Sequence, residues 1–206
     1  MTVFGIDVSH HNEIDNWHAV RSNNISFVSV KLTDSTTFVD PAAAGHIAGA
    51  RGAGIHVGGY HFARDVDVES QVEKFSAKLT AHDLLRPDSL APMLDMELQS
   101  LLRHKPNTFV AEFVQRLRKR TGVHRVLVYA NLDTWRHVLR PDEWADDHVG
   151  LWIARYNGDP GKPGWSHPRL VLHQHTNHGT VPGIPAHVDR DATVGAHTMA
   201  DLLTAN

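Results

Sequence analysis

Hydrophobic residues in this chain alternate between short runs and longer amphipathic stripes. The short runs are rich in valine, leucine, isoleucine and aromatic residues and are bounded by turn-forming residues, a pattern typical of strands. We predict strands over residues 3–9, 26–33, 56–62, 90–97, 125–131, 150–156, 170–176 and 187–192.

The amphipathic stripes predict helices between the early strands. The clearest stripe contains Val68, Val72 and Phe75, which recur at spacings of four and three residues and so share one helical face. A second stripe ends in several basic residues, which favour the carboxyl end of a helix. We predict helices over residues 15–23, 41–53, 67–82 and 107–120.

Strands that alternate with helices indicate a mainly parallel sheet. About eight strands in a chain of 206 residues suits a small closed barrel. Residues 157–190 are rich in glycine and proline, so we expect loops and no helices between the last strands. We therefore predict an α/β fold, an irregular TIM-like barrel of the form (β/α)5(β)3, as a single catalytic domain over residues 1–206.

Composition excludes several classes of protein. The net charge of −3 and the pI of about 6.6 do not favour binding to nucleic acid or to an anionic membrane. The absence of cysteine excludes disulfides and thiolate metal sites. No apolar run is long enough to span a membrane, and the first residues lack the features of a signal peptide. We expect a monomer without membrane insertion.

Acidic residues lie at the ends of three predicted strands. In the apolar segment 90-LAPMLDMEL-98, Asp95 and Glu97 share one face of the strand, because alternate side chains point the same way. Reactive groups of a barrel gather at the C-terminal ends of its strands, and we assign Asp7 to that end of the first strand and Asp189 to that end of the last. Because the first and last strands of a closed barrel are neighbours, we expect Asp7 and Asp189 to lie close together.

Aromatic and amide side chains accompany these acids and form a candidate substrate-binding set: Tyr60, Tyr129, Asn131, Trp152, Tyr156 and Gln174. Carboxylates beside aromatic rings, without a cationic pocket, predict a neutral substrate rich in hydroxyl groups, which is a sugar. Glycoside hydrolysis requires one protonated acid and a second carboxylate. The spacing of about 6.5–7 Å between alternate strand residues leaves retention and inversion both open. The D-x-E pair of Asp95 and Glu97 also suits a substrate-assisted mechanism, in which an acetamido group of the substrate itself makes the attack.

Two alternatives remain open. The chain has 17 histidines, and His173 with His175 forms an H-x-H pair like those of metal-dependent barrel hydrolases. In so histidine-rich a chain such a pair also arises by chance, and we predict no metal site. The second alternative is a glycan-binding module of the cell wall without catalytic activity.

In their order and spacing, several segments together resemble family 25 of the glycoside hydrolases, the Chalaropsis-type lysozymes. The segments are 5-GIDVSHHNEIDNW-17, 27-FVSVKLTDS-35, 39-VDP-41, 57-VGGYHFA-63, 92-PMLDMEL-98, 128-VYAN-131, 151-LWIARY-156, Gln174 and 188-VDRD-191.

The resemblance implies an N-acetylmuramidase that hydrolyses the β-1,4 bond between N-acetylmuramic acid and N-acetylglucosamine in peptidoglycan, with retention and without a metal or other cofactor. It implies that Glu97 is the general acid, that Asp95 is its partner, and that Asp7 and Asp189 flank them. Tyr60, Trp152, Tyr156 and Gln174 fall where the family lines its sugar groove. Action at the bacterial wall would follow release as a phage endolysin or export by a non-classical route.

The sequence departs from the family pattern at three places. Asn12-Glu13 replaces the usual Gln-Gly, residues 31–35 lose a glycine, and Asp191 stands where the family usually has asparagine. These departures affect loops and substrate subsites, and they leave the four acids in place.

Overall fold

The structure is a computed structural model that describes residues 1–204. Its strands are β1 (Phe4–Val8), β2 (Ile25–Asp34), β3 (Phe38–Val39), β4 (His56–Phe62), β5 (Met93–Asp95), β6 (Val126–Asn131), β7 (Val149–Ala154), β8 (Leu170–Gly179) and β9 (Val188–Thr193). Its helices are α1 (Trp17–Ser22), α2 (Ala43–Gly52), α3 (Val68–Ala81), α4 (Gln99–Arg103), α5 (Pro106–Thr121), α6 (Leu132–His137), α7 (Pro141–Trp144) and the 3-10 helix η1 (Met199–Asp201).

Eight of the strands close into a barrel. The order is β1-β9-β8-β7-β6-β5-β4-β2, and parallel pairing of β1 with β2 completes the ring. Neighbouring strands are parallel except for β9, which is antiparallel to both β8 and β1. The short β3 adds an antiparallel hairpin to the edge of β2. The predicted irregular TIM-like barrel is confirmed.

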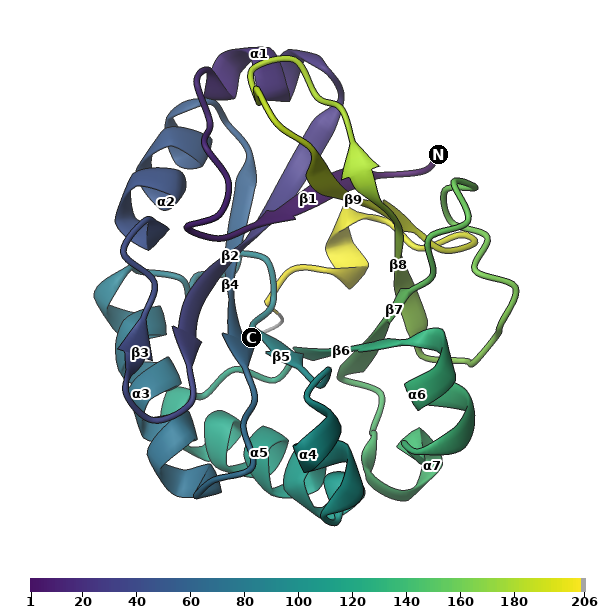
Figure 1. Ribbon diagram of the computed structural model, residues 1–206. Helices are drawn as coiled ribbons and strands as arrows, with labels where there is room; N and C mark the ends of the chain where they lie inside the picture. The colour runs from purple at the N-terminus through teal and green to yellow at the C-terminus, as the bar shows by residue number, and fades with distance from the viewer. Residues whose placement is uncertain (205–206) are drawn as a thin grey trace.

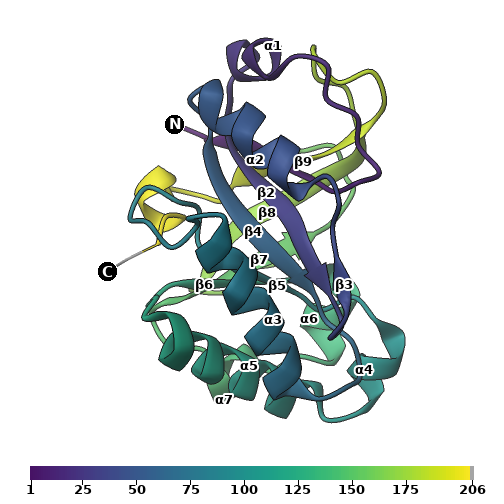
Figure 2. The ribbon, with the colours of Figure 1, turned by 90° about the vertical axis from the view of Figure 1, so that its left-hand side faces the viewer.

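Helices cover only part of the barrel. The first five connections between barrel strands contain helices, whereas β7 joins β8, and β8 joins β9, through loops. Figure 1 looks into the ring of strands, with α2, α3 and α5 along one side and loops beside β7, β8 and β9. Figure 2 shows α2, α3 and α5 lying outside the strands. Five helical crossovers followed by loops match the sequence prediction.

The fifth strand is shorter than predicted. The pattern predicts residues 90–97, but β5 contains only Met93–Asp95. One more backbone hydrogen bond follows β5, in which Met96 donates its N–H to the Tyr129 carbonyl at 2.9 Å. The chain then turns into α4. Glu97 therefore lies beyond the strand end, on the segment that leaves the barrel.

Alternate side chains of the strands form two hydrophobic cores. The inner core fills the barrel with Phe27, Met93, Leu127, Trp152 and Leu172 among others. The outer core packs the opposite faces of the strands against the helices. We call the end where the parallel strands finish the mouth, and the opposite end the base.

The base of the barrel is closed by the C-terminal segment. Leu90, Ala91 and Leu202 are fully buried there, and Ala91 donates its N–H to the Leu202 carbonyl at 2.9 Å. Thr204 donates its backbone N–H to the Ser89 carbonyl, also at 2.9 Å. Packing and backbone pairing thus hold the end of the described chain across the base.

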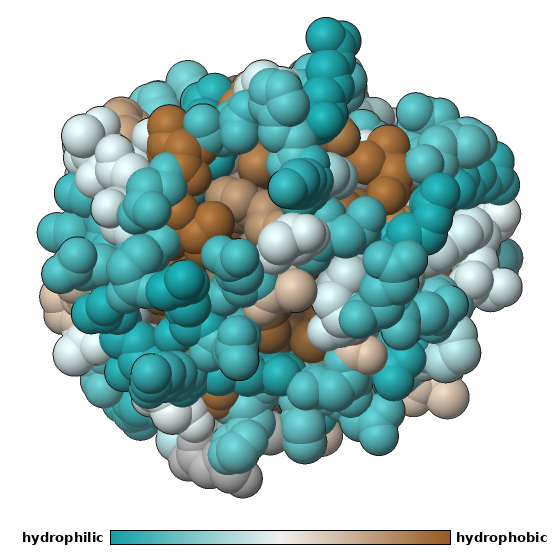
Figure 3. Space-filling view, turned by 90° about the horizontal axis from the view of Figure 1, so that it is seen from below, coloured by the Kyte–Doolittle hydropathy of each residue, from teal (hydrophilic) through white to brown (hydrophobic). Residues whose placement is uncertain are grey.

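The surface seen from below in Figure 3 is mostly hydrophilic, and hydrophobic residues are visible there in small separate patches. Within residues 1–204, no helix is both long and apolar enough to cross a membrane.

Candidate active site

Asp7 and Asp189 face each other across neighbouring strands. They are paired in the register of β1 and β9, as the sequence predicts. The structure corrects one detail, because Asp189 lies near the start of β9 and not near its end. Since β9 runs antiparallel to β1, its start lies at the same end of the barrel as the end of β1. Both acids therefore reach the mouth.

Asp95 and Glu97 add two more carboxyl groups to the mouth. Asp95 ends β5, between the parallel strands β4 and β6, and is buried. Glu97 is half-buried and lies at the edge of a cavity. The charge of Glu97 acts on Asp7, Asp95 and Asp189. The four acids that the sequence singles out are brought together.

A chain of hydrogen bonds connects these acids across the barrel. The Gln174 Nε2 donates to Asp7 Oδ2 at 2.6 Å, and the Tyr129 hydroxyl donates to Gln174 Oε1 at 2.7 Å. The same hydroxyl lies 3.3 Å from Glu97 Oε1. Tyr129 and Gln174 are both nearly inaccessible. They connect Asp7, on one side of the mouth, with Glu97 on the other.

Burial raises the pKa of every acid in this group, and repulsion from neighbouring carboxyl groups adds to it at Asp7, Asp95 and Asp189. Burial is the main cause in each case. It raises the pKa of Asp7 and of Asp95 well above the usual range, with further contributions from Asp189 at Asp7 and from Glu97 at Asp95. The pKa of Glu97 is raised, and that of Asp189 rises to about 6. A coupled set of carboxyl groups like this one retains some protons near neutral pH without every member being neutral.

The cavity beside Glu97 has a volume of about 400 Å³. Its lining includes Asn131, Arg136 and Tyr156. Asn131 is the N-cap of α6, where its side-chain oxygen accepts from the Thr134 N–H at 2.9 Å. Tyr156 is 53% exposed and provides an open aromatic face. The cavity places an aromatic ring and polar groups beside Glu97, the carboxyl group of the mouth that borders it.

Trp152 does not line this cavity. The sequence predicts it as a groove residue, but its side chain is 0% exposed and lies inside the barrel. Its indole N–H donates to Asp191 Oδ1 at 3.0 Å. Because no face of the ring reaches solvent, Trp152 acts on the acids from inside the barrel, through this hydrogen bond. Tyr60 is also nearly buried, and its pKa is raised by burial and by Asp7 and Asp95.

Two charged residues that the sequence interpretation did not assign lie at the mouth or just beneath it. Asp191 is considered further below. Lys31, on β2, lowers the pKa of both Asp95 and Glu97. Its ammonium group lies 3.6 Å from Asp34 and 4.8 Å from the centre of the Phe62 ring. The mouth therefore has a cation beside its acids, which the sequence interpretation did not predict.

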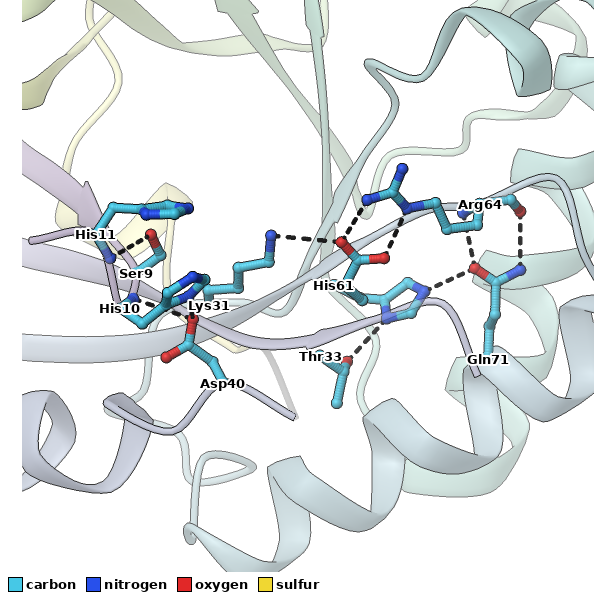
Figure 4. Close-up of polar contacts among 10 residues, drawn as sticks. Ser9, His10, His11, Lys31, Thr33, Asp40, His61, Arg64 and Gln71 are labelled. Atoms are coloured by element: carbon cyan, nitrogen blue, oxygen red, sulfur yellow. Dashed lines mark hydrogen bonds and ion pairs between the residues drawn. The ribbon is translucent and has the colours of Figure 1, made fainter. Parts of the chain in front are cut away.

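Asp34 holds Lys31 together with a second cation. Arg64 donates from Nε and Nη2 to the two carboxylate oxygens of Asp34, both at 2.7 Å. Lys31 Nζ lies 3.6 Å from the same carboxylate, and Figure 4 shows the side chains of Lys31 and Arg64 extending toward one another. The arrangement lowers the pKa of Asp34, through Arg64 and then Lys31, despite partial burial. The sequence at the end of β2 could have indicated this, since Lys31 and Asp34 lie three residues apart there.

The H-x-H pair points away from the acids. Gln174 reaches into the barrel, so its neighbours His173 and His175 lie on the other face of β8. His173 Nε2 is 2.8 Å from the Arg155 carbonyl, and burial lowers the pKa of His175 to about 4. Over residues 1–204, no cluster of three or more histidine, aspartate and glutamate side chains could hold a metal ion. The structure gives the metal-dependent alternative no support.

Comparison with known proteins agrees with this geometry. "Lysozyme M1" from Streptomyces globisporus is 26% identical over 202 residues, which cover 94% of this chain and 68% of that protein. An "N,O-diacetylmuramidase" from Arthroderma benhamiae is 26% identical over 179 residues, covering 80% and 73%. The bacterial lysozyme structure from Streptomyces coelicolor superposes with a TM-score of 0.80 at 26% identity, covering 94% and 92%. The family model for glycosyl hydrolases family 25 matches residues 6–184, and the chain belongs to this family.

Proposed function

We propose that this protein is a lysozyme, an N-acetylmuramidase that hydrolyses the β-1,4 bond between N-acetylmuramic acid and N-acetylglucosamine in bacterial peptidoglycan. The observation that carries the proposal is Glu97, a half-buried acid with a raised pKa at the edge of an open cavity, backed by Asp95. The two related proteins named as a lysozyme and as a muramidase support the choice of substrate.

Glu97 is the general acid in this proposal. It protonates the glycosidic oxygen as the bond to the anomeric carbon breaks. Burial favours its neutral form, and Tyr129 positions its carboxyl group. Among the acids of the mouth, Glu97 and Asp189 are the two that are only half-buried, and Glu97 is the one that borders the cavity.

Asp95 orients the acetamido group of the substrate. Its Oδ1 atom is buried and has no hydrogen-bond partner within the protein. An acetamido N–H donated to this oxygen stabilises the ionised form of Asp95. Binding of substrate thereby leaves the proton of the pair on Glu97 and aligns the acetamido oxygen for attack on the anomeric carbon. The configuration is retained when water opens the resulting ring.

Asp7 and Asp189 complete the mouth. Both carboxyl groups lie near the centre that becomes positively charged, and Asp7 is fixed there by Gln174. Their negative potential favours an oxocarbenium-like transition state over the neutral ground state. Tyr60, Tyr129, Asn131, Tyr156 and Gln174 contribute binding or positioning, whereas Trp152 acts from within the barrel.

The proposal is tested by muropeptide analysis of bacterial walls digested with the wild type and with Glu97→Gln. New reducing ends on muramic acid, produced by the wild type alone, are expected. Reducing ends on glucosamine would assign cleavage of the other glycosidic bond. A glycan-binding module without catalytic activity would release no reducing ends in either form, and the Glu97→Gln variant would bind walls as well as the wild type.

We also propose that the protein acts at the cell wall as a monomer, without insertion into a membrane. Endolysin release and non-classical export remain the two routes predicted from the sequence.

A further inference from the structure

Asp191 lies beneath the mouth, where the proposed mechanism makes no use of it. It sits two residues after Asp189 on β9, in register with Gly5 of β1 and with Gln174 of β8. Its side chain is 0% exposed. An ionised carboxylate in such a position is costly unless it is fully paired.

The two oxygens of Asp191 have different surroundings. Oδ1 accepts the indole N–H of Trp152 at 3.0 Å. Oδ2 is buried and has no N–H or hydroxyl donor as a partner. The register pairs Asp7 with Asp189, two residues before Asp191, so the neighbouring polar group on β1 is the carboxyl group of Asp7, which is itself an acceptor. A bond between two carboxyl groups requires a proton between them.

We infer that Asp7 and Asp191 share one proton, and that Asp191 is a positioning residue that donates this proton to an ionised Asp7. The inference rests on the proposed function only where it concerns activity. Asp191 is the neutral member of the pair and donates to the Asp7 carboxylate from one side. Gln174 Nε2 donates to Asp7 Oδ2 from the other side, at 2.6 Å.

The location of the proton follows from the donors on each side. Burial and Asp189 raise the pKa of Asp7, whereas hydrogen bonds from the Gln174 amide and from Asp191 lower it and favour the ionised form of Asp7. Burial raises the pKa of Asp191 well above its usual range, and the charges of Asp7 and Asp189 raise it further. The Trp152 N–H opposes this effect but is a single donor. The proton is therefore retained by Asp191.

The pair also determines the direction of the hydrogen bonds toward Glu97. With Asp7 accepting, Gln174 must present Nε2 to Asp7 and Oε1 to Tyr129. Tyr129 has one hydroxyl proton, and the shorter of its two contacts directs that proton to Gln174. Its oxygen is then free to accept from a protonated Glu97. Asp191 thus helps to hold Glu97 in the form that an acid catalyst needs.

Other titratable groups surround the pair on every neighbouring strand. They are Asp189 on β9, Asp95 and Glu97 at β5, Tyr60 on β4, Tyr129 on β6, Tyr156 after β7, and Lys31 on β2. Lys31 acts on Asp95 and Glu97, on the other side of the mouth. The acids nearest the pair, Asp189 and Glu97, both favour retention of its proton.

The proton is observed directly by carbon-13 NMR of protein labelled at the carboxyl carbon of aspartate. The resonance that disappears in Asp191→Asn belongs to Asp191, and the one that disappears in Asp7→Asn belongs to Asp7. At pH 6 we expect a protonated chemical shift for Asp191 and an ionised one for Asp7. Asp189→Asn, on the same strand, is the control and leaves the Asp191 resonance protonated. An ionised shift for Asp191 at pH 6 overturns the inference.

The coupling is tested in Asp7→Asn. The new amide donates to Asp191 and removes a negative charge, so the titration midpoint of Asp191 should move to lower pH. An unchanged midpoint contradicts the shared proton. Neither NMR result depends on whether the protein cleaves peptidoglycan, so failure of this inference is distinguished from failure of the proposed function.

Activity provides a further test. Asp191→Leu removes the donor to Asp7, and we expect kcat/KM to fall by about tenfold or more. Asp191→Asn retains an acceptor for Trp152 and an N–H donor for Asp7, so it should restore most of that loss. Equal losses in the folded Leu and Asn variants would contradict a positioning role based on hydrogen-bond donation.

Discussion

The two ends of the barrel bury opposite kinds of side chain, apolar at the base and acidic at the mouth. At the base, Leu90, Ala91 and Leu202 are fully buried, and backbone hydrogen bonds tie the C-terminal segment across them. At the mouth and just beneath it, Asp7, Asp95 and Asp191 are buried instead, and one oxygen of Asp95 and one of Asp191 have no N–H or hydroxyl donor within the protein. One end satisfies its polar groups and the other does not.

This difference separates stability from chemistry. Buried apolar side chains at the base contribute favourable free energy of folding. Crowded carboxyl groups at the mouth oppose folding whenever they ionise, and in the proposed function substrate binding and catalysis use them. Substitutions at the two ends should therefore have opposite consequences, and four predictions test that contrast.

The largest expected effect is loss of catalysis in Glu97→Gln. Removal of the general acid should lower kcat by about 1,000-fold, within the range for general acid catalysis. Folding stability should be kept, because the amide replaces an acid that burial already disfavours as an anion. Release of reducing ends from purified walls measures the first effect and urea unfolding the second.

Glu112→Gln is the matched control for this substitution. Glu112 lies on α5, away from the mouth, 3.8 Å from Arg116 in an exposed ion pair. Its replacement should leave both kcat and stability within experimental error, since exposed pairs contribute little. Comparable activity in the two variants would place the catalytic acid elsewhere.

Asp95→Asn should lower kcat by about 100-fold, as expected when one preorganised group is lost at a developing charge. The amide cannot accept the acetamido N–H as a carboxylate does, but it preserves the shape of the site. Substrates that lack the acetamido group should show little difference between the wild type and this variant. An equal loss with both substrates would remove the proposed orienting role.

At the base, Leu202→Ala should lower the free energy of unfolding by about 3 kcal/mol, as is typical for a large-to-small change in a buried core. The kcat of the folded fraction should be unchanged, because the cavity created lies at the end of the barrel opposite the acids. Val66→Ala, at a residue that is 47% exposed, is the control for side-chain truncation. A large fall in kcat for Leu202→Ala would couple the two ends.

The smallest expected effect is on the pH dependence of stability. The pKa of Asp189 is about 6 in the folded protein, above its usual value near 3.8. Between these values the folded state holds a proton that the unfolded state releases, so stability falls as pH rises from about 4 to 6. Asp189→Asn removes this contribution. The variant should match the wild type near pH 4 and gain stability relative to it by pH 6, as measured by urea unfolding.

The sequence predicts the barrel well because its physical signals are local. Strand and helix periodicities are visible along the chain, and the Gly- and Pro-rich stretch marks where helical connections stop. Closure of the barrel then follows, and it places Asp7 beside Asp189. The direction of β9 is not encoded locally, which is why the sequence places Asp189 at the wrong end of its strand.

The candidate site is predicted only in part, because burial depends on packing. Trp152 and Tyr156 are four residues apart and both aromatic, but one is enclosed by the inner core and the other is open to solvent. Lys31 reaches the mouth because Asp34 and Phe62 hold its ammonium group there. Asp191 and Asp189 lie two residues apart on β9, but Asp191 is buried and Asp189 is only half-buried.

The central claim is that the mouth carries the chemistry and the base carries the stability. Its most direct test measures kcat and the free energy of unfolding on the same preparations of Glu97→Gln and Leu202→Ala. The account predicts a loss of kcat with stability intact for the first, and a loss of stability with kcat of the folded fraction intact for the second. Loss of both quantities in both variants, or full activity in Glu97→Gln, would contradict it.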